Sequence, residues 1–400
     1  PDRGAKRPRD EGSREESRSR QKTAGRDARR APVRSEADGE EQTADREKIL
    51  ERLMDQDTED PEFGGQVVAL MVQTWSVWTR GEGGSLIGVY TTFKGSNGSN
   101  LRSSLLSAVI ENMAEFRPGL CTEAAQQGLM QWLLKRIKAK MPFDANKLYC
   151  SEILAILLQN NDKTRELLGE MDGIDVLLQQ LSKKMSRVSA LKVLDYGVIG
   201  PEGSDNCHKF VDILGLRTIF PLFMKTPKKM KKVGVSDKEH EEHVCSIIAS
   251  MLRNLKGQQR SRLLSKFTEN DCEKVDRLME LHFKYLEAVQ LADKRIEGEK
   301  HDMVRRGEII DDAMDDEFYL RRLDAGLFVL QLVCYIMVEI CNAGVPQLQQ
   351  RVHQILNLRG GSVKIVRHIM REYAENIGDG KSEEFKESEQ KRILELLENF

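Results

Sequence analysis

Aromatic residues and prolines are scarce in this 400-residue sequence: Phe, Trp and Tyr together make up 6%, and there are ten prolines. Charged residues, in contrast, make up 32% of the chain. This mixture favours a soluble, helix-rich protein over a sheet protein, because strands are usually rich in aromatic side chains and proline breaks helices. The length fits either two or three compact domains or one extended array of helices.

Cysteine pairs and long apolar runs are also missing. The seven cysteines are odd in number, scattered and never in a C-x-x-C pair, which indicates a reduced compartment. The longest apolar run, residues 325–341, includes Gln331 and Glu339. A membrane span needs about 20 apolar residues, so we expect a buried helix here and no membrane association.

No signal peptide is visible, and because the chain begins with Pro rather than Met we expect it to be a fragment.

No pattern for catalysis or for a cofactor is present. His240 and His243 are three residues apart, whereas the zinc-protease motif needs two histidines four apart on one helical face. The glycine-rich stretch lacks the Gly-Lys-Ser/Thr of a phosphate loop, and no nucleic-acid-binding module can be found. The sequence therefore predicts a protein that is not an enzyme, holds no metal or cofactor, and does not depend on direct binding of nucleic acid.

The first 60 residues are polar and carry opposite charges at their two ends. Residues 1–34 contain twelve basic and six acidic residues, and residues 36–62 contain three basic and twelve acidic residues. Such a segment cannot bury enough apolar surface to fold, so residues 1–60 are predicted to be a disordered tail. Its two basic clusters are typical of a bipartite nuclear localisation signal, with a solvated tail or an RNA-binding arm as alternatives. The residues of this signal are Lys6, Arg7, Pro8, Arg9, Arg18, Arg20 and Lys22.

Glycines recur at a regular interval in the middle of the chain. Gly128, Gly173 and Gly215 are 45 and 42 residues apart, and each lies between an apolar helix and a second helix that opens on Leu or Ile. This is the period of stacked armadillo or HEAT repeats. One helical hairpin cannot cover its own apolar face, so neighbours stack and share a core, and a glycine at the turn supplies a left-handed backbone. The predicted fold is therefore all-α, an armadillo/HEAT-type helical-repeat solenoid.

The other segments are organised around these repeats. Residues 66–73 are predicted to be a helix fragment, residues 74–107 an irregular glycine-rich insert, and residues 108–400 the helical-repeat domain. Towards the C-terminus, the sequence predicts an acidic loop at residues 311–317 and one apolar helix over residues 318–341.

Two sets of candidate binding residues remain. Trp132 and Asn146 could hold an extended peptide in the groove of a solenoid, although each fits a structural role at least as well. A basic loop follows the third glycine turn and could contact phosphate or an acidic protein, whereas exposed lysines usually contact neither. Its lysines are Lys225, Lys228, Lys229, Lys231 and Lys232.

Several stretches closely resemble the beta-catenin-like family of armadillo-repeat proteins, and the resemblance extends over most of residues 109–400. These stretches are residues 111–118, 140–152, 210–221, 296–310 and 373–380. The resemblance implies a nuclear protein attached to the spliceosome through the complex that contains the Prp-nineteen ubiquitin ligase. It also implies binding of basic, localisation-signal-like segments of partners, among them a Myb-related subunit of that complex and the antibody-diversifying cytidine deaminase. The family's own import signal, which importin-type receptors bind, maps onto residues 6–9 and 18–22.

The chain departs from the family at three places. Helical hairpins expected before residue 66 are absent, residues 74–107 have no counterpart, and about one repeat is missing between Ser182 and Lys183. The apolar faces on either side of the missing repeat must pair with each other or lie exposed, so we expect a shortened and less stable solenoid.

Three functions fit these patterns. The resemblance favours a nuclear scaffold of the splicing machinery that binds basic peptide segments in the solenoid groove. The alternatives are an RNA-binding accessory factor, acting through the basic tail and the lysine loop, and a carrier similar to nuclear-import adaptors. The sequence is compatible with a monomer and with a homodimer.

Overall fold

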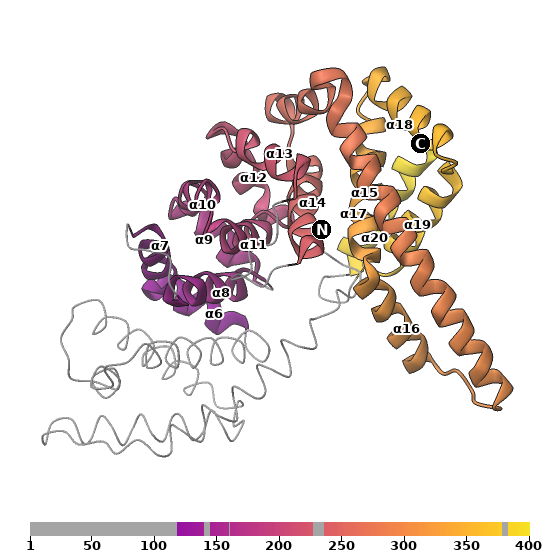
Figure 1. The fold of residues 1–400 in the computed structure, drawn as a ribbon. Helices are drawn as coiled ribbons and strands as arrows, with labels where there is room; N and C mark the ends of the chain where they lie inside the picture. Colours follow the sequence, from indigo (N-terminus) through magenta and orange to yellow (C-terminus); the bar gives the residue numbers. More distant parts are fainter. Residues whose placement is uncertain (1–117, 140–144, 160, 227–235, 378–382) are drawn as a thin grey trace, which may run out of the picture. The chain divides into compact units, whose positions relative to one another are not determined.

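The computed structural model describes residues 118–139, 145–159, 161–226, 236–377 and 383–400 (Figure 1). The tail, the localisation signal, the helix fragment and the insert, all within residues 1–107, lie outside the described residues. The described part is helical and contains no strand, which confirms the predicted all-α fold. It forms two compact units, residues 118–197 (the N-terminal unit) and residues 198–400 (the C-terminal unit).

The N-terminal unit consists of six α-helices and one π-helical turn among its described residues. In chain order they are α6 (Pro118–Ala124), η1 (Ala125–Leu129), α7 (Met130–Lys138), α8 (Ala145–Gln159), α9 (Asp162–Glu170), α10 (Gly173–Leu181) and α11 (Arg187–Gly197). Helix α8 lies at the centre of this unit, because both α7 and α11 pack against it. Leu154, Leu157 and Leu158 of α8 are fully buried, which places the core of the unit along this helix.

The C-terminal unit is built around α17, whose fifteen residues are all buried. The elements of this unit are η2 (Pro201–Gly203), α12 (Ser204–Asp212), α13 (Leu216–Met224), α14 (Asp237–Asn254), α15 (Gly257–Arg305), α16 (Asp312–Ala325), α17 (Leu327–Cys341), α18 (Pro346–Leu358), α19 (Val363–Glu375) and α20 (Glu383–Glu398). Helices α14, α15, α18 and α19 pack against α17. Within the described residues, 312–341 contain a window apolar enough to cross a membrane, but 89% of that window is buried in the protein. Helix α17 is therefore a core helix.

The second repeat contains three helices, whereas the sequence predicted a hairpin of two. The apolar helix α8 is followed by the short helix α9, the turn with Gly173 and the short helix α10. Helices α12 and α13 lie on either side of Gly215, as the sequence predicted. The unexpected helix α9 has nine residues, most of them charged or polar, and shows little of the apolar period that identifies a helix in a sequence.

Two of the repeat glycines, Gly173 and Gly215, are needed for close packing, and only Gly128 has the left-handed backbone that the sequence predicted for all three, with φ +118°. At the other two turns the left-handed residue is the one before the glycine, Asp172 (φ +54°) or Leu214 (φ +68°). A Cβ atom at Gly173 would lie 2.7 Å from the carbonyl oxygen of Leu168, and one at Gly215 would lie 2.5 Å from the ring of Phe210. Both turns thus bring the chain against the residue five positions earlier, where only glycine fits.

Side chains of the following helix close the C-terminal end of α8. The hydroxyl of Thr164 donates to the carbonyl of Leu157 at 2.6 Å. The buried guanidinium of Arg165 donates to the carbonyls of Leu158 (3.1 Å) and Gln159 (3.0 Å). The last carbonyls of a helix have no partner within the helix, so Arg165 has a structural role in this repeat.

The third repeat lacks this arginine, as the sequence indicated, and a different side chain takes its place. Asn254 of α14 donates from its amide to the carbonyls of Val198 (3.2 Å) and Gly200 (2.8 Å). Cys207, at the position of Arg165, is fully buried beside Val198.

Two predictions for the C-terminal half were wrong. Residues 311–317 are not an acidic loop, because Asp311 caps α16 through the backbone N–H of Met314 at 2.9 Å and the next acidic residues form its first turn. Carboxylates at this end of a helix favour it through the helix dipole. The predicted single helix over residues 318–341 is divided into α16 and α17 at Gly326, whose φ is +120°.

Helix α15 runs from Gly257 to Arg305 with a kink at residues 269–272. Asn270, Asp271 and Cys272 have left-handed backbone angles within it. Beyond the kink, α15 pairs with α16 in a hairpin that has a small core of its own, formed by Ile296, Met303 and Phe318.

A polar side chain without a partner lies where α10 meets α11. Both amide atoms of the buried Gln180 have no hydrogen-bond partner. The side chain lines a cavity of about 10 Å³ together with Lys147 and Ser151 of α8 and Ser186 beside α11. An unpaired buried amide costs about 1–3 kcal/mol.

We expect Leu214→Gly to stabilise the chain by up to about 1 kcal/mol, because a left-handed non-glycine residue is strained by about 1–2 kcal/mol and glycine also gains entropy in the unfolded chain. The matched change Gly215→Ala should destabilise it by about 1–3 kcal/mol through the contact with Phe210. Urea denaturation followed by circular dichroism measures both. Equal effects of the same sign would contradict this account of the turn.

Gln180→Leu should stabilise the chain by about 1–2 kcal/mol, because it removes two unpaired polar atoms from the interior. The control is Gln179→Leu, since Gln179 is an exposed neighbour on the same helix, and it should change stability by less than about 0.5 kcal/mol. A loss of stability in Gln180→Leu would show that the amide is hydrogen-bonded in solution by a water in the cavity.

Candidate functional site

The helices that follow the repeat glycines are the candidate binding elements. In the N-terminal unit these are α7 and α10, which pack against each other. Helix α7 exposes basic residues in its last turn, Lys135 and Lys138, with Arg136 half-buried between them. An acidic edge lies on the other helices: Glu166 and Glu170 of α9 and Asp172 of the turn before α10 are all exposed. The unit therefore exposes basic side chains on α7 and mainly acidic side chains on α9 and the turn before α10, where Lys163 is also exposed.

The structure places the predicted peptide-binding residues on different helices. Trp132 lies on α7 and is half-buried. Asn146 is the second residue of α8, and its side chain lies outside the described part. Of the basic loop, Lys225 is exposed at the end of α13, whereas Lys228, Lys229, Lys231 and Lys232 lie outside the described residues. The same holds for all seven residues of the localisation signal.

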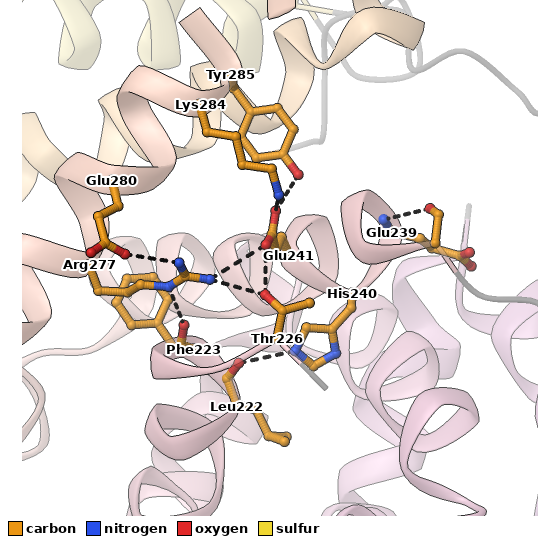
Figure 2. A network of polar contacts seen from close by, with 11 residues as sticks. Leu222, Phe223, Thr226, Glu239, His240, Glu241, Arg277, Glu280, Lys284 and Tyr285 are labelled. Carbon is orange, nitrogen blue, oxygen red and sulfur yellow. Dashed lines mark hydrogen bonds and ion pairs between the residues drawn. The ribbon is translucent and has the colours of Figure 1, made fainter. Parts of the chain in front are cut away.

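A buried carboxylate, Glu241 of α14, organises the polar contacts at the end of α13 in the C-terminal unit (Figure 2). The hydroxyl of Thr226 donates to its Oε1 at 2.6 Å, and the ammonium of Lys284 donates to its Oε2 at 2.6 Å. The hydroxyl of Tyr285 also donates to Oε2. Arg277 lies 3.5 Å from Oε1. One carboxylate thus connects α14, α15 and Thr226, the second residue beyond the end of α13.

The same cluster closes the C-terminal end of α13. The Nε of Arg277 donates to the carbonyl of Phe223 at 3.1 Å, and a ring nitrogen of His240 lies 3.0 Å from the carbonyl of Leu222 (Figure 2). A second nitrogen of Arg277 donates to the hydroxyl of Thr226 at 3.0 Å. Helix α13 is therefore held by side chains of both α14 and α15.

The partners of Glu241 keep it ionised. Burial raises the pKa of this carboxyl, but hydrogen bonds from Lys284, Thr226 and Tyr285 together outweigh burial and hold the pKa below its ordinary value. A carboxylate with a lowered pKa stabilises the fold above its ordinary pKa, and this contribution is lost as the pH falls through the folded-state value.

A second buried carboxylate, Glu339 of α17, holds the C-terminal helices. Arg260 of α15 and Arg392 of α20 lie 3.0 Å and 2.8 Å from its two oxygens. The hydroxyl of Tyr335 donates to it at 2.5 Å. Breaking such a pair is costly because it leaves a charge unpaired in the interior, so this cluster is structural.

Metal-ligating groups do not gather anywhere in the described residues. No set of three or more His, Cys, Asp and Glu side chains there is arranged to hold a metal ion. The seven cysteines are buried and form no disulfide, and burial raises the pKa of Cys121 and Cys341 to about 12. The thiols of Cys121 and Cys341 are therefore protonated at neutral pH and are poor nucleophiles.

Sequence reasoning considered residues 240–243 only as a metal motif and missed the role of Glu241. One signal was present: Val244, Cys245 and Ile248 follow Glu241 at intervals of three, four and seven, which places it on the apolar face of α14. All four side chains are buried there.

We expect Glu241→Gln to destabilise the chain by about 1–3 kcal/mol, because it removes the charge that Arg277 and Lys284 face. The control Glu280→Gln, whose carboxylate is 64% exposed and 3.1 Å from Arg277, should cost less than about 1 kcal/mol. The difference between the original chain and Glu241→Gln should shrink below about pH 4.3, where Glu241 becomes protonated in the unfolded and then the folded chain. Urea denaturation across pH 3–7 measures this; a difference that stays constant with pH would contradict the charged role of Glu241.

Comparison with known proteins identifies the family. The family model described as "Catenin-beta-like, Arm-motif containing nuclear" matches residues 97–183 and 181–371. Beta-catenin-like protein 1 of Bos taurus is 65% identical over 387 residues, and that of Homo sapiens is 64% identical; each alignment covers 84% of this chain and 66% of the relative. A Beta-catenin-like protein 1 homolog of Schizosaccharomyces pombe is 27% identical over 291 residues, covering 58% of this chain and 48% of the relative. The chain thus spans about two thirds of the length of its mammalian relatives, and it belongs to the catenin-beta-like family of nuclear, Arm-motif-containing proteins.

Proposed function

We propose that this chain is a non-enzymatic scaffold of the nuclear pre-mRNA splicing machinery that binds basic, localisation-signal-like segments of other proteins. The family match over most of the chain carries this proposal. The helical-repeat fold supports it, because stacked helices present long surfaces that suit peptide segments. The proposed partners are proteins of the Prp-nineteen-type complex, including its Myb-related subunit, and the antibody-diversifying cytidine deaminase.

The charge distribution of the N-terminal unit supports one binding surface for such segments. The acidic edge formed by Glu166, Glu170 and Asp172 offers three exposed carboxylates to lysine and arginine side chains. The end of α7 around Lys135 and Lys138 repels the same ligands. Basic segments are therefore proposed to lie along α9 and the start of α10, with Trp132 as a candidate apolar contact.

We further propose that one repeat unit is absent between α10 and α11. The two family-model matches meet at residues 181–183, between these helices. The unpaired amide of Gln180 lies at the same place.

Inserting the matching segment of a mammalian relative there should give Gln180 a partner and abolish the stabilisation expected from Gln180→Leu. If Gln180→Leu still stabilises the chain after the insertion, this result would contradict the proposal that a repeat unit is missing.

Binding of a fluorescent peptide with a cluster of lysines and arginines, followed by anisotropy, tests the scaffold proposal. The dissociation constant should rise between 50 and 200 mM salt, because exposed charges are screened. The double variant Glu166→Gln/Glu170→Gln should raise it about three- to tenfold, equivalent to about 0.7–1.4 kcal/mol. The control Glu395→Gln/Glu398→Gln removes two exposed charges from α20 and should leave the constant unchanged.

Other outcomes would favour the alternatives. Binding that is insensitive to salt, or equal loss in both double variants, would contradict recognition at the acidic edge. Strong RNA binding that survives deletion of residues 1–60 would favour an RNA-binding factor. Release of the peptide by the nuclear GTPase would favour an import adaptor.

A further inference from the structure

One stretch of the C-terminal unit contains basic residues and no acidic ones. Residues 340–371 include five lysines and arginines and two histidines but no Asp or Glu, although Asp and Glu make up 64 of the 400 residues of the chain. The stretch covers the end of α17, all of α18 and most of α19. Its basic side chains can therefore find acidic partners only in other segments.

Two of these basic residues have such partners or a backbone partner. The guanidinium of Arg351 donates to both carboxylate oxygens of Asp276 on α15, at 2.7 Å and 2.8 Å. Arg367 donates to the carbonyl of Phe400 at 3.1 Å. These contacts hold α18 against α15, and α19 against the residues that follow α20. Arg351 and Arg367 are thus used within the fold.

Three other residues of the stretch lie along one exposed face of α19. Lys364, His368 and Arg371 follow one another at intervals of four and three, which places them on the same side of the helix. All three are exposed, whereas Val366 and Ile369 bury the opposite face. No acidic side chain of the described residues lies within ion-pair distance of any of the three. Their charges are therefore not used within the described part of the fold.

Arg359, in the turn between α18 and α19, adds a further exposed charge. Its guanidinium lies over the ring of Phe283, 4.2 Å from the ring centre. The turn packs on the same ring, since a Cβ atom at Gly361 would lie 3.1 Å from it. Stacking restricts the guanidinium, so less conformational entropy is lost when it binds a carboxylate. We refer to Arg359, Lys364, His368 and Arg371 as the basic stripe.

The stability of α19 does not explain the lysine at its start. Lys364 lies in the first turn of α19, and this turn has no acidic residue. The N-terminal end of a helix carries a partial positive charge, so a carboxylate there is stabilising and a cation is not. Lys364 therefore costs the helix some stability, and its charge is available for a partner.

An exposed aliphatic side chain, and no aromatic one, accompanies the basic stripe. Leu358, the neighbour of Arg359, is 76% exposed. Residues 340–371 contain no Phe, Tyr or Trp. Proteins that bind single-stranded nucleic acids combine cations with aromatic side chains on which the bases stack. Cations beside an exposed leucine suit an acidic peptide that also carries an aliphatic side chain.

We propose that the basic stripe and Leu358 bind an acidic peptide segment of a partner protein. Carboxylates pair with Arg359, Lys364 and Arg371, and an aliphatic side chain of the segment packs on Leu358. The rise of a helix places Lys364 and Arg371 about 10 Å apart along its axis, a distance that about three or four extended residues span. An arginine can bind a carboxylate through two parallel hydrogen bonds, which favours carboxylates over other acceptors.

This surface is independent of the one proposed for basic segments. The acidic edge belongs to the N-terminal unit and takes ligands rich in lysine and arginine, whereas the basic stripe belongs to the C-terminal unit and takes ligands of the opposite charge. Failure of one proposal therefore leaves the other unaffected.

Anisotropy of a labelled twelve-residue peptide, made of glutamates and two leucines, tests the proposal on the full chain. Lys364→Gln/Arg371→Gln should raise its dissociation constant about three- to tenfold, because two of the paired charges are lost. The control Lys294→Gln/Arg295→Gln removes two exposed basic residues of α15 and should leave the constant unchanged. The α19 double variant should also melt no lower than the original chain, since neither residue has a partner in the described fold.

Leu358→Ser separates the apolar part of the surface from its charge. It should raise the dissociation constant about two- to fivefold and leave the salt dependence of binding unchanged, whereas the α19 double variant should reduce that dependence. An equal loss in both double variants, or no loss in either, would overturn the site. A constant unaffected by Leu358→Ser would overturn the role of the leucine. A twelve-nucleotide oligouridine that binds more tightly than the peptide, and that the α19 double variant releases, would overturn the acidic peptide in favour of RNA.

Discussion

The repeats depend on how the carbonyls at the ends of their helices are satisfied. Helices of nine to fifteen residues leave a large share of their carbonyls without a partner within the helix. At α8 the partners are Thr164 and Arg165 of the next helix. At α13 they are His240 and Arg277, from α14 and α15. Both helix ends are therefore completed by a later part of the chain, so the stability of each of these helices depends on the helices that follow it.

Composition and glycine spacing were sufficient to predict the fold class, because both depend on short-range patterns that a sequence shows directly. The extra helix of the second repeat, α9, could not be predicted, since it has charged residues at most positions and little apolar period. The acidic run at residues 311–317 was mistaken for a loop, although carboxylates suit the first turn of a helix. The division at Gly326 was hidden inside an apolar run, where periodicity carries no information.

The candidate sites were predictable only in part, because they join residues far apart in the chain. Thr226, Glu241, Arg277 and Lys284 come from three segments, and no local pattern connects them. Trp132 was singled out as a candidate peptide contact or a structural residue, and its half-buried position on α7 is compatible with both roles. Surface charge was visible in the sequence as composition, whereas its separation into a basic α7 and an acidic α9 required the structure.

The way helix ends are completed also bears on the proposed absence of a repeat between α10 and α11. The cap of α8 comes from Thr164 and Arg165, which precede the proposed junction, and that of the third repeat comes from Asn254, which follows it. The proposed junction at Ser182 and Lys183 therefore separates neither of these helix ends from its cap. The end of α10 is completed across the junction, because Arg187 of α11 donates to the carbonyl of Leu181 at 2.9 Å. Helix α11 thus packs against α8 and α10 and supplies a cap to the helix before the junction, while the buried amide of Gln180 beside it has no hydrogen-bond partner.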